Sequence, residues 1–105
     1  MVESNVKINL FNDTDYQESS VVSKALLKKP SGNITFFAFD KGEQLSPHSA
    51  PFDAMVHVID GTAEIMIGEE FHNLSAGEII IMPANITHAV KANEKFKMML
   101  IMLKS

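Results

Sequence analysis

The stretch GEQLSPHSAPFDAMVHVIDG, residues 42–61, decides how the rest of this chain folds. Pro47 and Pro51 have no backbone N–H to donate, so the part that holds His48 should lie at a strand edge or at a bend. The run AMVHVI, residues 54–59, is nearly continuous apolar, which predicts a strand covered on both faces. The stretch therefore predicts an irregular edge segment that leads into a buried β-strand.

Short segments separated by turn residues continue this pattern along the chain. Asp60-Gly61 predicts a hairpin, because Asp-Gly supplies the two positive φ values of a type I′ turn. No stretch has a convincing helical period or helix caps, and segments of this length are typical of an all-β sandwich or barrel. The predicted strands cover residues 6–11, 21–27, 34–40, 54–59, 62–67, 71–74, 79–82, 86–92 and 96–103.

Composition excludes several classes of protein. The chain has 105 residues, enough for one domain, and no apolar run approaches the roughly eighteen residues that cross a membrane. Residues 1–15 lack the basic start and apolar centre of a signal peptide, so we expect a cytoplasmic location and no membrane partner. There is no cysteine, and the net charge of −4 argues against a nucleic acid as partner.

A second informative stretch is GEIIIMPANITHAVKA, residues 77–92. It combines a glycine turn, an apolar strand, a proline turn and a single histidine, His88. Asn85 stands in the turn, and after glycine, Asn is the residue that best tolerates a positive φ. The two stretches therefore each carry one histidine close to a proline turn.

Together the two stretches resemble the two signatures of the cupin family. The first signature reads Gly, five residues, His, one, His, three or four, Glu, six, Gly; every interval is kept, but Ala50 and Ala54 stand at the second His and the Glu. The second reads Gly, five, Pro, one, Gly, two, His, three, Asn, and here Asn85 and Ala92 replace the second Gly and the Asn. The resemblance implies a double-stranded β-helix, or jelly-roll barrel, over residues 1–105, with a site in its mouth.

Matched residue by residue, the family's metal-ligand positions fall on His48 and His88, with Ala50 and Ala54 at the other two. A catalytic divalent metal needs three or four protein ligands, and an alanine side chain cannot coordinate. A divalent ion (Zn, Fe, Mn, Ni or Cu) is therefore an alternative, and a site without a metal cofactor is favoured. His57 is the candidate third ligand.

Strand parity argues against His57 as a ligand. If Ala54 points into the barrel, His57 points away, unless a bulge reverses the alternation. His72 sits beside the predicted turn at Asn73 to Gly77 and should face solvent or a partner subunit. Asp53 could orient His48, although we favour its interpretation as an ordinary loop acid.

We therefore expect a small-molecule-binding module, with a ligand or sensor pocket at the barrel mouth formed by His48, His88, Phe52 and Met82. The alternative is a metal-dependent enzyme of the isomerase or oxygenase type that uses the two histidines. We also expect a homodimer, because several strands are apolar on both faces and cupin barrels usually pair. Residues 1–20, read as a strand and a loop, are expected to cross over to the partner.

Overall fold

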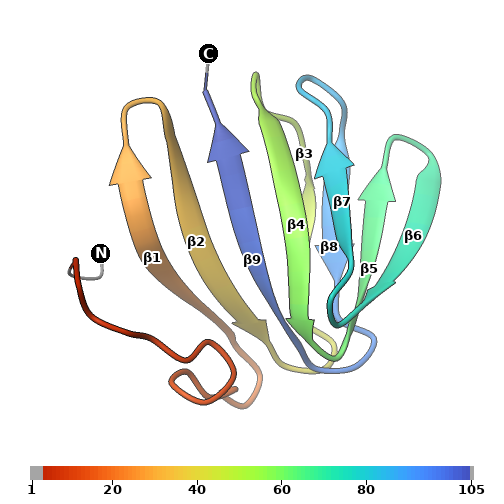
Figure 1. The fold of residues 1–105 in the computed structure, drawn as a ribbon. Coiled ribbons are helices and arrows are strands. Elements are labelled where there is room, and N and C mark those ends of the chain that lie inside the picture. Colours follow the sequence, from red (N-terminus) through yellow and green to blue (C-terminus); the bar gives the residue numbers. More distant parts are fainter. Residues whose placement is uncertain (1–3, 105) are drawn as a thin grey trace.

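The computed structural model describes residues 4–104, and their regular elements are nine β-strands (Figure 1). These described residues contain no helix and thus none that could span a membrane. The all-β prediction is confirmed. The strands are β1 Val21–Lys29, β2 Gly32–Phe39, β3 Gln44–His48, β4 Asp53–Asp60, β5 Thr62–Ile67, β6 Glu70–Ser75, β7 Ile79–Met82, β8 His88–Lys91 and β9 Phe96–Leu103.

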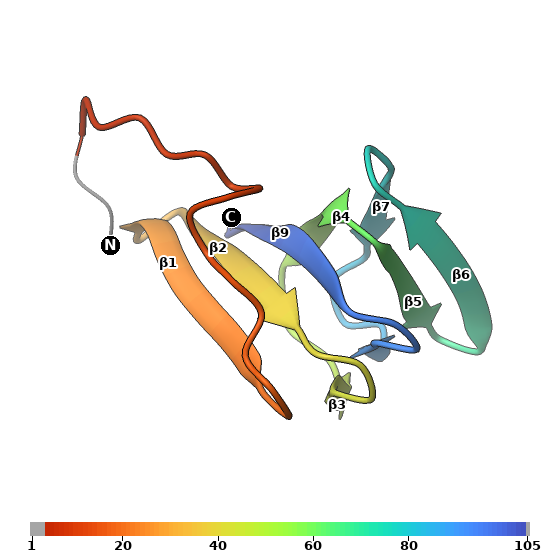
Figure 2. The same ribbon diagram turned by 90° about the horizontal axis from the view of Figure 1, so that it is seen from below.

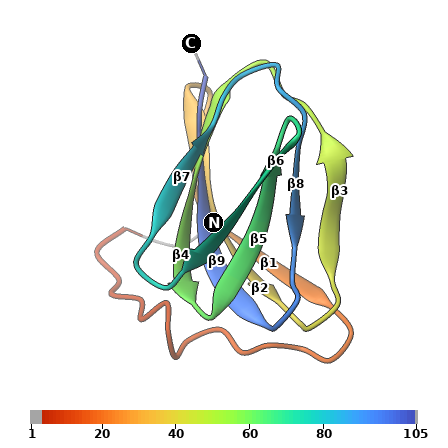
Figure 3. The ribbon, with the colours of Figure 1, turned by 90° about the vertical axis from the view of Figure 1, so that its right-hand side faces the viewer.

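The strands form two antiparallel sheets that face each other (Figure 3). The order is β1-β2-β9-β4-β7 in the five-stranded sheet and β3-β8-β5-β6 in the four-stranded sheet. From β2 onward the chain changes sheet at every connection except the one between β5 and β6. This winding is that of a double-stranded β-helix, so the predicted jelly-roll barrel is confirmed.

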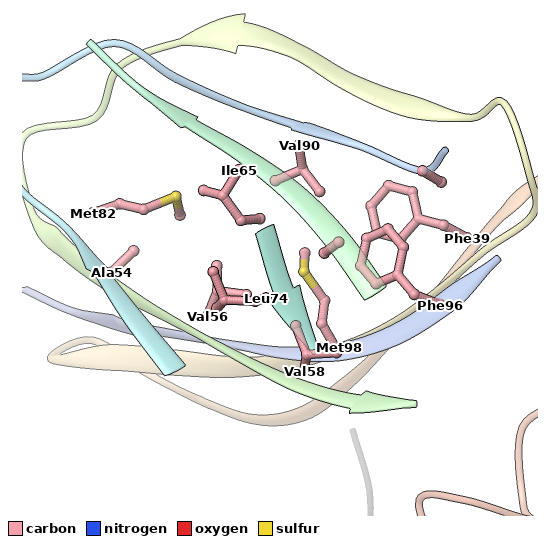
Figure 4. Close-up of a cluster of buried hydrophobic side chains, with 12 residues drawn as sticks. Phe39, Ala54, Val56, Val58, Ile65, Leu74, Met82, Val90, Phe96 and Met98 are labelled. Carbon is pink, nitrogen blue, oxygen red and sulfur yellow. The ribbon is translucent and has the colours of Figure 1, made fainter. Parts of the chain in front are cut away.

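Side chains from the inner faces of both sheets fill the space between them (Figure 4). Alternate residues point inward, as the two-residue period of a strand requires: Val56 and Val58 on β4, and Ala63 and Ile65 on β5, are fully buried. The buried cluster comprises Phe39, Ala54, Val56, Val58, Ala63, Ile65, Leu74, Met82, Val90, Ala92, Phe96 and Met98.

The connection at Asp60-Gly61 is not the predicted hairpin, because β4 and β5 belong to different sheets. Gly61 has a positive φ of 75°, but Asp60 does not, so the turn is not type I′. A Cβ on Gly61 would clash with the backbone oxygen of Lys95 and lie 3.0 Å from Cβ of Phe96. The glycine is thus needed where the chain crosses between the sheets against the backbone that leads into β9.

The predicted strand at residues 6–11 is wrong, because local side-chain bonds turn the backbone there. Oδ1 of Asn9 accepts hydrogen bonds from the backbone N–H groups of Phe11 and Asn12, both at 3.0 Å. The Asp13 carboxylate accepts the N–H of Asn9 at 2.7 Å. Asn and Asp side chains that bond to nearby backbone groups compete with strand pairing. Here these local bonds outweigh the strand preference of the scattered apolar residues.

Residues 4–20 instead run along the outer side of the five-stranded sheet (Figure 2). The hydroxyl of Tyr16 donates to Oδ2 of Asp60 at 2.6 Å, and Nζ of Lys97 donates to the carbonyl oxygen of Phe11 at 2.7 Å. The Lys97 ammonium also lies 5.0 Å from the centroid of the Tyr16 ring, and Lys97 is 4% exposed. Burial, together with the Asp60 carboxylate, raises the pKa of Tyr16. These contacts hold the N-terminal segment on its own barrel.

We predict that Gly61→Ala destabilises the fold more than Gly42→Ala. Both glycines have positive φ, at 75° and 89°, which costs an alanine about 1–2 kcal/mol. Only at Gly61 would the added methyl group meet neighbouring atoms, which should cost a further ~1–3 kcal/mol, whereas nothing lies within 4 Å at Gly42. Urea unfolding of both variants measures the difference, and equal losses would contradict the close approach at Gly61.

Candidate functional site

His48 and His88 come from neighbouring strands of the four-stranded sheet and lie side by side at one end of the barrel. β3 is an edge strand, and its pairing with β8 shifts between Leu45 and His48, where Pro47 cannot donate to the ladder. After this irregularity His48 pairs with His88, and their ring centroids are 4.5 Å apart with the planes at 70°. The predicted convergence of the two rings is confirmed.

Each imidazole is held by the backbone two residues earlier. Nδ1 of His48 lies 2.7 Å from the carbonyl oxygen of Ser46, and Nδ1 of His88 lies 3.2 Å from that of Ile86. A carbonyl oxygen can only accept, so the proton of each neutral ring sits on Nδ1 and the lone pair on Nε2. Sequence analysis missed these partners, because every residue type carries a carbonyl group.

The two rings differ in burial, and burial makes His88 harder to protonate. His88 is 6% exposed, whereas His48 is exposed at the edge of the sheet. Burial lowers the pKa of His88 from its ordinary 6.5, and the positive charge that His48 can carry lowers it further, against an opposing effect of the Ile86 carbonyl. Near pH 7 His88 is thus a neutral hydrogen-bond acceptor at Nε2.

The loops that flank the pair are tied to each other. The N–H of Asn85 donates to the carbonyl oxygen of Ala50 at 2.7 Å, and the N–H of Ala84 donates to Oδ1 of Asp53 at 2.9 Å. Asn85 has a φ of 64°, as predicted from its place in the turn. Asp53 is the first residue of β4 and not the predicted loop acid, and it ties the start of that strand to the loop at Ala84. The Ser46 carbonyl is the group that bonds to the His48 ring.

The other residues predicted at the mouth lie in different surroundings. Ala54 and Met82 are paired on the inner faces of β4 and β7, and at 5% and 2% exposure they belong to the buried cluster (Figure 4). Phe52 is half-buried, and Nζ of Lys104 lies 5.4 Å from its ring centroid, just beyond the end of β9. Met82 is thus a core side chain, and Phe52 lies next to the C-terminal end of β9.

The remaining two histidines lie elsewhere. His57 pairs with Met99 on β9 and Ile79 on β7, on the outer face of the five-stranded sheet, so the parity prediction is confirmed. Nε2 of His72, on β6, lies 3.5 Å from a carboxylate oxygen of Glu70. Neither imidazole is placed to join the pair.

The side chains at the mouth provide too few donor atoms to form a metal centre from protein ligands alone. Within residues 4–104, no three histidine or carboxylate side chains come together in a way that could hold an ion. His48 and His88 supply two nitrogen atoms, while Ala50 and Ala54 supply none, and catalytic zinc centres typically have three protein ligands. The pair taken alone fits a hydrogen-bonding site better than a metal site.

Comparisons with known proteins agree with this architecture. The family model described as Cupin domain matches residues 35–104. A conserved protein of unknown function from Streptococcus pyogenes is similar over 99% of this chain and 91% of its own, with 36% identity and a TM-score of 0.93. A cupin superfamily protein from Desulfitobacterium hafniense DCB-2 is similar over 99% of this chain and 95% of its own, with 25% identity and a TM-score of 0.91.

A cupin 2 conserved barrel domain protein from Leptotrichia buccalis shares 44% identity, with a TM-score of 0.88. The similarity covers 92% of this chain and 47% of that protein, so this chain spans about half of its length. No curated protein matches the chain. The descriptions of these three similar proteins name no substrate and no reaction.

We predict that His88→Gln flattens the dependence of stability on pH. Because the pKa of His88 is lowered by folding, the unfolded chain takes up a proton at a higher pH than the folded chain does. Stability that is fully present above about pH 6.5 is therefore lost as the pH falls through the folded pKa. In urea unfolding with a chelator present, His88→Gln should lose less stability between about pH 7 and pH 5 than the unmodified chain.

His72→Gln is the matched control for this measurement, because its imidazole has no part in the pair. A flattening confined to His88→Gln would come from the buried ring of the pair. A His88→Gln variant with the slope of the unmodified chain would contradict a lowered pKa at His88.

Proposed function

The chain belongs to the cupin family, and we propose that it binds a small, mostly apolar molecule at the mouth of its barrel. The observation that supports this proposal is the pair formed by His48 and His88, with ring centroids 4.5 Å apart and both Nδ1 atoms bonded to backbone carbonyls. Each Nε2 can then accept a hydrogen bond from a ligand. Binding sites of this kind combine a few placed polar groups with apolar surroundings.

The chemistry of the pair favours an uncharged ligand with a hydroxyl or N–H group. A neutral His88 has no positive charge with which to attract an anion. All nine basic residues of the chain are lysines, so no guanidinium is available to clamp a carboxylate or a phosphate. The two adjacent acceptors match a ligand with two neighbouring donors, such as a pair of hydroxyl groups.

Packing inside the barrel favours a small ligand. Met82, Ile65 and Val56 fill the space between the sheets and are almost fully buried (Figure 4). A ligand would thus be held at the mouth, between the loops joined by Asn85 and Ala50, and would not enter the interior. Reversible binding at such a place suits a sensor or a carrier and needs no catalytic group.

The second candidate function is a metal-dependent enzyme of the isomerase or oxygenase type. One observation favours it: the carbonyl bonds to Nδ1 leave Nε2 of His48 and His88 as the donor atoms, which is how metal-binding histidines are usually oriented. A bound divalent ion would supply Lewis-acid or redox chemistry there. Its remaining ligands would have to come from water or substrate.

Nuclear magnetic resonance of the imidazole groups tests the first proposal, because the chain has four histidines and only two of them form the pair. We expect neutral compounds with adjacent hydroxyl groups to shift the ring signals of His48 and His88. The signals of His57 and His72 serve as internal controls and should stay in place. Compounds that shift all four rings, or none, would count against a site at the mouth.

The same spectra separate the two candidate functions. Zn²⁺ added to untagged, chelator-treated protein should leave the pair unchanged if no metal belongs there. Saturable shifts at His48 and His88 with one equivalent of Zn²⁺, lost in His48→Ala and His88→Ala but not in His72→Ala, would favour the metal-dependent enzyme. Elemental analysis of the protein as purified provides an independent measurement of any bound metal.

A further inference from the structure

The outer face of the four-stranded sheet carries a hollow that has no part in the site at the mouth. The side chains of Val90 on β8 and Ile65 on β5 point into the core, so the residues on either side of them point outward. The strands follow the order β3-β8-β5-β6 (Figure 3), and the hollow has a volume of about 150 Å³. All four strands contribute residues to its lining.

Strand register creates the apolar half of this hollow. Ala89 on β8 lies opposite Met66 on β5, and Met66 lies opposite Phe71 on β6, which is 65% exposed. On the other side of Ala89, the irregular part of β3 contributes Pro47. A methyl group therefore forms the floor of the hollow, and larger apolar side chains stand around it.

Polar and charged side chains form the other half. Lys91 on β8 lies directly opposite Gln44 on β3 and Glu64 on β5, and all three residues line the hollow. Within residues 4–104, neither the Lys91 ammonium nor the Glu64 carboxylate forms an ion pair or a hydrogen bond with another side chain. The hollow thus offers a cation, an anion and an amide beside its apolar floor.

The size and lining of the hollow select for a single ring. An apolar cavity of about 150 Å³ can hold one benzene molecule, so this hollow has room for one six-membered ring. Phe71 and Met66 favour an aromatic ring over an aliphatic chain, because aromatic side chains and the methionine sulfur both make favourable contacts with such rings. The apolar half therefore fits a small aromatic group.

We infer that this hollow binds a free aromatic amino acid. The ring lies over Ala89 between Met66 and Phe71, the carboxylate faces Lys91, and the ammonium group faces Glu64. Charge complementarity supports this occupant. An amino acid carries both charges on one carbon atom, and directly opposite residues of antiparallel strands, such as Lys91 and Glu64, have Cβ atoms about 4.5–5.5 Å apart.

The hollow is a second site, separate from the one proposed at the mouth. On β8, His88 and Val90 point to the inner face and Ala89 and Lys91 to the outer face, as strand alternation requires. An occupant of the hollow therefore does not touch Nε2 of His88. The inference goes beyond the proposed function and does not depend on it.

Nuclear magnetic resonance of the methyl groups tests this inference on the unmodified chain. L-phenylalanine should shift the methyl signals of Ala89 and Met66 with a dissociation constant on the order of 1 mM, as expected for a small ligand in a hollow open to solvent. Phenethylamine, which lacks the carboxylate, and phenylpropionate, which lacks the ammonium group, should each bind about three- to fivefold more weakly. L-leucine, which lacks the ring, should also bind more weakly.

The ring signals of His48 and His88 should stay in place during these titrations, because the pair lies on the other face of the sheet. Shifts confined to the two histidines, or no saturable shift at Ala89 and Met66, would overturn the inference. L-leucine that binds as tightly as L-phenylalanine would rule out an aromatic amino acid as the occupant.

Two variants with matched controls complete the test. Ala89→Leu fills the hollow and should abolish the shift at Met66, whereas Ala25→Leu, at an exposed alanine on β1 of the other sheet, should not. Circular dichroism checks that both variants fold. Lys91→Gln should remove the preference for L-phenylalanine over phenethylamine, and Lys41→Gln, at an exposed lysine outside the hollow, should keep it. A folded Ala89→Leu variant that still binds, or a Lys91→Gln variant with the full preference, would contradict the inferred site.

Discussion

The close approach of Gly61 to the backbone of Lys95 is the constraint on which this barrel depends. At this point the chain leaves the five-stranded sheet and enters the four-stranded one, so the inner faces of β4 and β5 become the two walls of one apolar interior. Once these walls are opposed, the two-residue period of each strand decides which side chains are buried. Ala54 and Val56 turn inward, and His57 between them is left on the outside.

The histidine pair follows from the same winding. β3 and β8 are far apart in sequence, yet they pair in the four-stranded sheet, and the irregularity at Pro47 brings His48 opposite His88. The backbone then supplies the two carbonyl groups that orient the rings. The geometry of the pair is thus set by strand register and by main-chain atoms.

The resemblance of two stretches to the cupin signatures implied the jelly-roll barrel and the convergence of His48 and His88, whereas strand alternation predicted the outward direction of His57. The sequence was misleading at Asp60-Gly61, where a good local turn motif serves a crossing between sheets, since strand partners are chosen by long-range packing. It failed at residues 6–11 because hydrogen bonds to Asn9 and Asp13 outweigh weak strand propensity. Main-chain partners such as the Ser46 carbonyl could not be predicted from the sequence, because every residue carries a carbonyl group.

The enclosure of Lys97 has a consequence for the chemistry of its amine. An ammonium group held against a carbonyl oxygen and an aromatic ring is shielded from acylating reagents, whereas one as open as that of Lys41 reacts freely. Acylation of Lys97 would require the N-terminal segment to lift away from the barrel. The rate at which Lys97 is acylated would therefore report how often the N-terminal segment detaches from the barrel.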